Sequence, residues 1–253
     1  MSARPAEGAA AHLRPADDNP LVPVILFIFA LVGGALAAVF APLYLDLFRR
    51  ELSRSDELEK IAAGLRLRFS KADPAYPGSS AFRYPFELFS RGIDQVCENF
   101  MTGTIGGVDI VAFDFLYRLR LDSDDEPDKH ARSEPIRFSC AVVMVDGQRP
   151  HVVIERASAA LPTRADGEPV RLEWGDFNAR YRVISPDRGF AAALLDVDLM
   201  AWLVDAAPPL ALTWEIQREW VLCRSPILGP KDVAALVTAM PEFARRIGRS
   251  ATD

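Results

Sequence analysis

The segment from Leu21 to Leu45 contains no charged residue and constrains the chain more than any other feature. As a helix, its 25 residues would extend about 37 Å, which exceeds the roughly 30 Å hydrocarbon core of a bilayer. A helix also satisfies its own backbone hydrogen bonds, as a chain inside lipid must. The sequence therefore predicts a single transmembrane helix within residues 20–46.

A cleavable secretory signal is the alternative interpretation of this segment. Such a signal has a short basic leader, an apolar region of about 7–15 residues and a small-residue cleavage site. Here residues 1–20 form a slightly acidic leader, and the best cleavage candidate ends at Ala41, directly before Pro42. A retained anchor is therefore the prediction.

Basic residues beside the apolar segment predict its orientation, because Lys and Arg are concentrated on the cytoplasmic side. Arg49, Arg50, Arg54 and Lys60 follow the segment, whereas only two arginines precede it. We expect an external N-terminus, a domain at the cytoplasmic face, and the lipid bilayer as a partner. Arg49, Arg50 and Arg54 are the predicted membrane-flanking residues.

Small residues recur every four positions inside the apolar segment. Ala30, Gly34 and Ala38 form one such series. This spacing lets helix backbones approach closely. A homodimer or a membrane-protein partner held through the anchor helix is therefore a further candidate interaction.

Charge and cysteine content narrow the function classes. The net charge is −6, and the residues after Leu45 contain 27 basic and 32 acidic side chains. Nucleic acid is not an expected partner, because phosphate contacts need clustered Lys and Arg.

Cys97, Cys140 and Cys223 are widely spaced and odd in number. They indicate neither a disulfide framework nor a zinc site, and reduced core thiols are the prediction.

Composition divides the remaining chain into segments. Residues 1–19, rich in Ala, Pro and charge, are typical of a disordered tail. Residues 47–70 are expected to contain a juxtamembrane amphipathic helix, since their apolar positions recur at helical spacing. Residues 71–95 include a Pro- and Gly-rich connection, and residues 96–249 form the predicted folded domain.

Alternating apolar residues predict several strands in this domain. The pattern is clearest from Val111 to Leu121 and from Ile136 to Met144. Gly106-Gly107 sits between two such runs, as in a hairpin. Strands joined in sequence by hairpins, with helices appended rather than alternating, indicate an antiparallel sheet. The predicted fold class is α+β, with one N-terminal transmembrane helix followed by one antiparallel-sheet domain.

Helices are expected in the second half of the domain. Ser185, followed by proline, is a predicted N-cap, and Asp196 is a second one. The apolar positions of residues 231–247 recur with a period of 3.6. Pro241 is expected to kink or restart this last helix.

The stretch 173–203 resembles an uncharacterised bacterial family of single-pass membrane proteins. The matching elements are Asp-Phe at 176–177, Arg-Tyr-Arg-Val at 180–183, the Leu-, Met- and Trp-containing helix at 194–203, and Ala-Phe-Asp at 112–114. The resemblance implies a short N-terminal anchor and a cytoplasmic α+β domain. The family has no assigned activity, so no functional residue is transferred from it.

No catalytic, cofactor or metal constellation is found in the sequence. His12, His130 and His151 lack metal-ligand spacing, and no serine lies in a nucleophile motif. Trp214 and Trp220 belong to apolar patterns, with an exposed ligand edge as the alternative.

Asp114 is the most interesting single position, because it lies within an apolar strand where a carboxylate can be partly buried. A structural hydrogen bond to a neighbouring strand or turn is the favoured interpretation, and an active-site carboxylate is the alternative. The predicted function is a membrane-tethered binding or scaffold module. The alternative is a tethered hydrolase that uses carboxylates such as Asp114.

Overall fold

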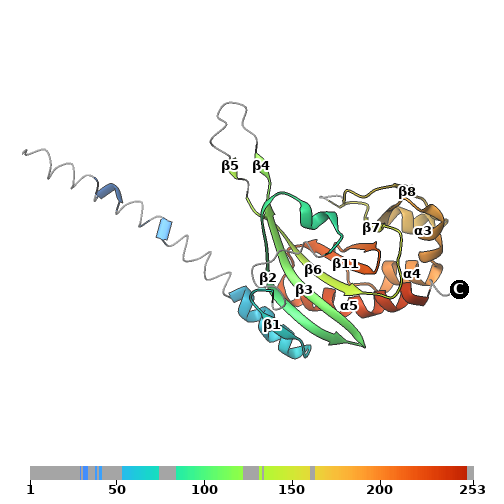
Figure 1. Cartoon of the computed structure of the whole chain (residues 1–253), viewed down its shortest axis with the longest axis horizontal. Helices are drawn as coiled ribbons and strands as arrows, with labels where there is room; N and C mark the ends of the chain where they lie inside the picture. The colour runs from blue at the N-terminus through green and yellow to red at the C-terminus, as the bar shows by residue number, and fades with distance from the viewer. Residues whose placement is uncertain are drawn as a thin grey trace, which may run out of the picture. The chain divides into compact units, whose positions relative to one another are not determined.

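The structure is a computed structural model. It describes residues 29, 31–33, 38, 40–41, 53–73, 84–121, 131–132, 134–159 and 163–249. The chain divides into two compact units, Met1–Glu51 and Leu52–Asp253. In the first unit the described positions are helical. The second unit contains the sheet and the helices that pack on it (Figure 1).

The predicted fold class is wrong in its first element. Among the described residues, no helix is long and apolar enough to cross a membrane. The transmembrane helix predicted at 20–46 is therefore not seen, and most of that segment lies outside the described residues, as does the tail 1–19. The physical reason is that an uncharged run specifies composition, whereas a span also needs about 20 consecutive helical residues.

Nine strands form one antiparallel sheet. Its order is β1 (Arg68–Ser70), β2 (Ile93–Ile105), β3 (Val108–Arg118), β6 (Ile136–Met144), β11 (Trp220–Pro226), β10 (Thr213–Gln217), β7 (Val152–Arg156), β9 (Tyr181–Ser185) and β8 (Glu168–Val170). A separate two-stranded ladder joins β4 (Arg120–Leu121) to β5 (Ala131–Arg132). The predicted hairpin at Gly106-Gly107 joins β2 to β3.

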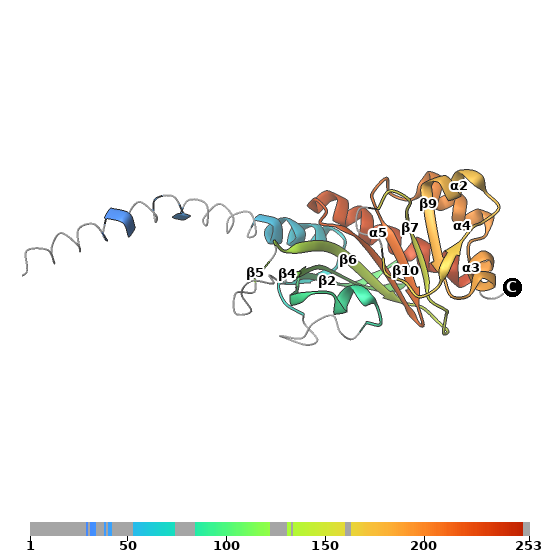
Figure 2. The same ribbon diagram turned by 90° about the horizontal axis from the view of Figure 1, so that it is seen from above.

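Helices cover one face of the sheet. The helix at residues 53–64 and α5 (Pro230–Arg249) lie on the same side of the strands (Figure 2). The remaining helical elements are η2 (Glu87–Ser90), α2 (Gly175–Arg180), α3 (Arg188–Leu194), α4 (Val197–Ala201) and the π-helical turn η3 (Trp202–Ala206). Figure 2 shows η2 on the side of the sheet opposite to α5.

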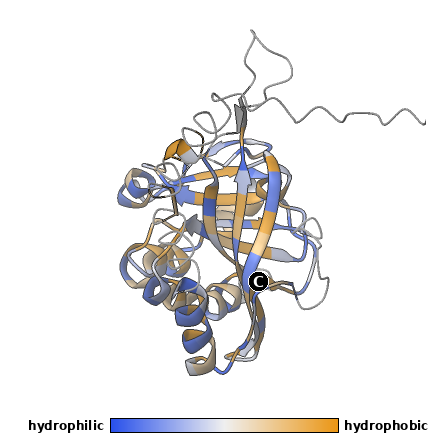
Figure 3. Ribbon diagram, turned by 90° about the vertical axis from the view of Figure 1, so that its left-hand side faces the viewer, coloured by the Kyte–Doolittle hydropathy of each residue, from blue (hydrophilic) through white to orange (hydrophobic). Residues whose placement is uncertain are grey.

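The helix-covered face contains the larger apolar core. Leu236, Met240 and Phe243 of α5 are completely buried, and the Phe243 ring stacks on Trp214 with 4.2 Å between ring centroids. Leu58 of the 53–64 helix is buried in the same core. Figure 3 shows hydrophobic and hydrophilic positions alternating along the strands, as expected when the two faces of a sheet differ.

The opposite face carries an aromatic core. Tyr84 and Phe89 cover Phe113 and Phe115, and the Phe89 and Phe115 rings meet edge to face at 5.1 Å. Tyr84 meets the half-buried Trp220 at the same centroid distance. Trp214 and Trp220 therefore pack against other rings, and no exposed tryptophan pair forms a ligand edge.

Two predicted helix starts and one predicted kink can be compared with the structure. Asp196 caps α4 by accepting a hydrogen bond from Leu199, as its position predicts. Asp187 rather than Ser185 caps α3, because Ser185 is the last residue of β9. α5 continues through Pro241 as one helix, so this proline does not end the helix.

Strand β2 contains two irregularities in its pairing with β3. The register shifts between Ile93 and Val96 and again between Glu98 and Met101. Asp94 and Asn99, which lie at these shifts, have left-handed φ angles of 54° and 58°. Asn and Asp tolerate this conformation better than other side chains that have a Cβ. The second bulge turns Asn99 into the helix-covered face, where it becomes part of a polar cluster.

Candidate functional site

Asp114 lies on the helix-covered face of β3 and is 5% exposed. Its carboxylate forms a two-point ion pair with Arg54, at 2.9 Å to Nε and 2.8 Å to Nη2. Asn99 donates a third hydrogen bond at 3.0 Å, and the Ser139 hydroxyl donates a fourth at 3.2 Å. Both oxygens of the carboxylate are thus bound by protein groups.

The same cluster joins five parts of the fold. Arg54 also donates to the Leu228 carbonyl at 2.6 Å, and the Leu228 amide donates to Ser139 at 3.1 Å. Ser55 donates to the Asn99 side chain at 2.7 Å. These bonds connect the 53–64 helix to β2, β3, β6 and the segment that enters α5. The cluster therefore holds the first helix of the unit on the sheet.

This geometry argues against a hydrolytic role for Asp114. A catalytic carboxylate needs a reachable proton partner, whereas the group paired with Asp114 is a guanidinium, which stays protonated in proteins. Asp114 lines none of the cavities found in the described part of the chain. Arg54, expected at the membrane, is engaged inside the folded unit; Arg49 and Arg50 lie outside the described residues.

A second polar cluster lies on the opposite face of the sheet. Glu215 of β10 is fully buried, and one of its oxygens is 2.9 Å from Nε2 of His151. Glu155 of β7 is also fully buried and pairs with Arg182 of β9. Arg224 of β11 lies in the same cluster, with its guanidinium 5.2 Å from the centre of the Phe138 ring. Burial lowers the pKa of Arg224, although the charge of Glu215 partly offsets this effect.

Thr163 connects this cluster to the loop at residues 163–167. Its backbone amide and its hydroxyl both donate to Glu155, at 2.9 and 3.0 Å, and the hydroxyl accepts from Arg224. Gly167 fixes the other end of the loop. Its φ is +116°, and an added Cβ would lie 2.3 Å from the backbone of Ser185, so only glycine permits this approach. The loop is thus anchored at both ends.

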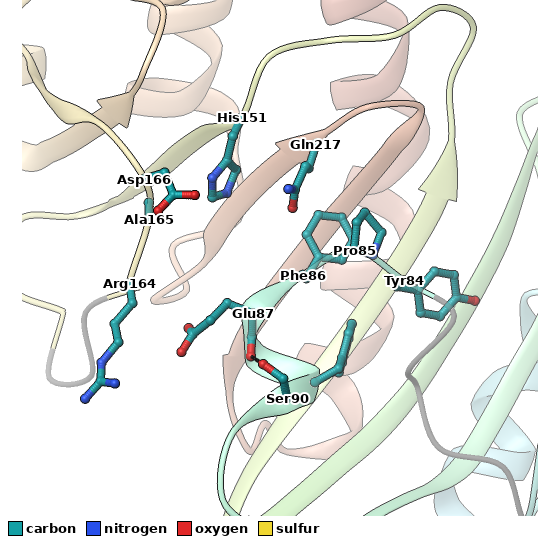
Figure 4. A pocket seen from close by; sticks show the side chains of 11 residues that line it. Tyr84, Pro85, Phe86, Glu87, Ser90, His151, Arg164, Ala165, Asp166 and Gln217 are labelled. Atoms are coloured by element: carbon teal, nitrogen blue, oxygen red, sulfur yellow. Dashed lines mark hydrogen bonds between the residues drawn. The ribbon is translucent and has the colours of Figure 1, made fainter.

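A cavity of about 470 Å³ lies between this loop and the segment 84–90. Its lining is Tyr84, Pro85, Phe86, Glu87, Phe89, Ser90, His151, Arg164, Ala165, Asp166 and Gln217. Figure 4 shows the Asp166 carboxylate directed toward the His151 ring, with the Gln217 amide on the same side. The Arg164 side chain points away from His151 in that view. The cavity therefore has an aromatic wall and a polar end centred on His151.

His151 is oriented by its buried carboxylate partner. A carboxylate accepts a hydrogen bond from the N–H of one ring nitrogen, and that bond determines which nitrogen carries hydrogen. Glu215 therefore holds Nε2–H, which leaves Nδ1 as the second functional atom of the ring. The hydroxyl in the cavity, Ser90, donates to the Glu87 carbonyl at 2.8 Å. A base with an orienting carboxylate is present, but the serine that lines the same cavity is hydrogen-bonded to backbone.

The second cluster is incompletely satisfied. One oxygen of Glu215 and Nε of Arg224 are buried without a hydrogen-bond partner among the described residues. Within the same residues, no group of three His, Cys, Asp or Glu side chains could hold a metal ion.

Sequence reasoning found Asp114 and missed His151, Glu155, Glu215 and Arg224. A signal was present, since Glu155, Glu215 and Arg224 each interrupt an otherwise apolar strand. A charge in such a position must find a partner when it is buried. The identity of the partners depends on which strands are neighbours, and the sequence does not specify that order.

Comparison with known proteins shows a likeness of fold. No protein-family model and no curated protein matches this chain. A solved structure described as the mycobacterial trehalose monomycolate transport factor A, TtfA, is similar to 78% of this chain and 94% of its own, with a TM-score of 0.53 and 13% sequence identity. At that identity the likeness shows that the two chains share a bacterial α+β fold and nothing about their ligands.

Proposed function

We propose that this protein is a binding module of a membrane-associated assembly and not a carboxylate hydrolase. The observation that carries the proposal is the contrast between its two buried carboxylates. Asp114 is neutralised by Arg54 in a closed cluster, whereas Glu215 orients His151 at a cavity whose serine, among the described lining residues, donates to a backbone carbonyl. Such a cavity suits recognition better than covalent chemistry.

Three further observations support this proposal. The structural neighbour is described as a transport factor. The uncharged sequence from Leu21 to Leu45 favours association with lipid. Arg49 and Arg50, which follow it, and three cysteines without disulfides favour the cytoplasmic face. Confinement at a bilayer would raise the effective concentration of the module for membrane-bound partners.

Site-specific photo-crosslinking in membranes tests the proposal. A photoreactive residue in place of Ser90, at the rim of the cavity, is expected to give a defined adduct with a partner. The same residue in place of Asp205, which is exposed and outside the cavity, is the matched control. Absence of any adduct at position 90, or equal adducts at both positions, would contradict a binding role for the cavity.

A further inference from the structure

The cavity beside His151 combines hydrogen-bond acceptors with aromatic rings. If Glu215 holds Nε2–H of His151, the free Nδ1 is an acceptor at the polar end of the cavity. Asp166 adds a carboxylate and Gln217 an amide oxygen at the same end (Figure 4). Tyr84 and Phe86 line the wall. Acceptors outnumber donors here, so the matching ligand group is a donor.

The charges around the cavity show which donor is needed. The buried charges are matched within the protein, since Glu155 pairs with Arg182 and the charge of Glu215 acts on the buried Arg224. The half-buried Glu87 pairs with Arg91. Asp166 differs from them, because the described part of the chain gives it no hydrogen bond or ion pair. Arg164 is near in sequence but is directed away from His151. One carboxylate at the polar end is thus left to be matched by a cation.

We propose that this cavity binds a primary ammonium group, contributed by a small amine or by the amine end of a larger molecule. An ammonium has three donors and no acceptor, which fits His151, Asp166 and Gln217. Tyr84 and Phe86 line the same cavity, and aromatic rings attract a cation. The anchored loop keeps Asp166 at the cavity before a ligand arrives, which reduces the ordering cost of binding. This inference rests on the proposed binding role of the cavity and specifies its ligand class.

Titration of the full chain with propylammonium, followed by NMR of the histidine ring signals, tests this inference. The substitution His151→Gln identifies the His151 signal among the three histidines. We expect a saturable shift of that signal with propylammonium. We expect at least tenfold weaker binding of 1-propanol, which has the same shape without the charge.

Two variants separate the site from general charge effects. Asp166→Asn is expected to weaken propylammonium binding about tenfold, because it removes the charge that faces the ammonium. Asp205→Asn removes one equally exposed charge elsewhere and should leave the affinity unchanged. Both residues are exposed, so both variants should fold.

Three results would overturn the inference: no saturable shift, equal binding of 1-propanol, or equal effects of Asp166→Asn and Asp205→Asn. A failed titration together with a positive crosslink at position 90 would contradict the ammonium ligand but not the binding role of the cavity. Failure of both experiments would contradict the binding role of the cavity as well.

Discussion

The two buried polar clusters lie on opposite faces of one sheet and differ in how far their charges are satisfied. Asp114 receives hydrogen bonds from Arg54, Asn99 and Ser139 and does not line the cavity beside His151. Glu215 receives one from His151, and its second oxygen has no partner within the described residues. The same chemical group therefore fixes a helix on one face and orients a histidine at a cavity on the other.

The largest expected effect comes from Arg54→Ala. This change leaves the buried Asp114 carboxylate without its cation, and the free energy of unfolding should fall by about 3–5 kcal/mol. Urea denaturation of the full chain measures it. Lys60→Ala, an exposed change on the same helix, should stay within about 0.5 kcal/mol. A loss below about 1 kcal/mol for Arg54→Ala would mean that the cluster does not hold the helix.

A smaller effect is expected when the two carboxylates are compared directly. Asp114→Asn should cost about 3 kcal/mol because Arg54 loses its partner. Glu215→Gln should cost less than about 1.5 kcal/mol, because Arg224 keeps its bond to Thr163 and its contact with Phe138. The same denaturation experiment compares them, and equal costs would show that the two clusters are equally structural.

Cysteine labelling compares how easily the two faces open. Burial raises the pKa of the Cys140 and Cys223 thiols well above their ordinary value, so both should resist alkylation in the folded protein near pH 8. Cys140 lies under the aromatic cover and Cys223 under the helices. We expect Cys140 to react several-fold faster than Cys223, measured by mass spectrometry in a Cys97→Ser background. Faster alkylation of Cys223 than of Cys140 would mean that the helices protect their face of the sheet less well than the aromatic cluster protects the other.

The smallest expected effect lies in the turn between β10 and β11. The pKa of Glu219 is lowered by a hydrogen bond from its own backbone amide and by one from Gln148. Because the folded pKa is below the unfolded one, the associated stability is present above about pH 4.5 and disappears as the pH falls through the folded pKa. Glu219→Gln should therefore make the acid limb of the stability curve slightly flatter, as followed by thermal unfolding between pH 3 and 6. A curve identical to wild type would contradict this assignment.

The sheet was largely predictable because period-two patterns report directly on half-buried strands. The alternation from Val111 and the hairpin at Gly106-Gly107 both correspond to β3 and its turn. The outcome at Ser185 could not be predicted in the same way. Ser185 has the right chemistry for a helix cap, but pairing with β8 keeps it in a strand and moves the cap to Asp187.

The candidate site was less predictable, because its residues are distant in sequence. Asp114 and Arg54 are 60 positions apart, and His151 and Glu215 are 64 apart. Counting basic residues near the apolar segment assigns Arg54 to the membrane. Such a count contains no information on tertiary contacts, so it could not reveal the pairing of Arg54 with Asp114. Strand order, which brings β7 beside β10, determines the second pair. Local patterns do not encode that order.

The two bulges of β2 have a consequence for the behaviour of many copies in solution. A long, flat strand near the margin of a sheet can recruit the same strand of another molecule, and such recruitment seeds aggregates. Among the described strands, β1 pairs with only three residues of β2, Phe100–Thr102. Asp94 and Asn99, with left-handed φ angles, lie at the two places where the pairing of β2 with β3 is interrupted. Asn99, which donates to Asp114, thus also disturbs β2 near the edge of the sheet and so discourages molecules from associating edge to edge.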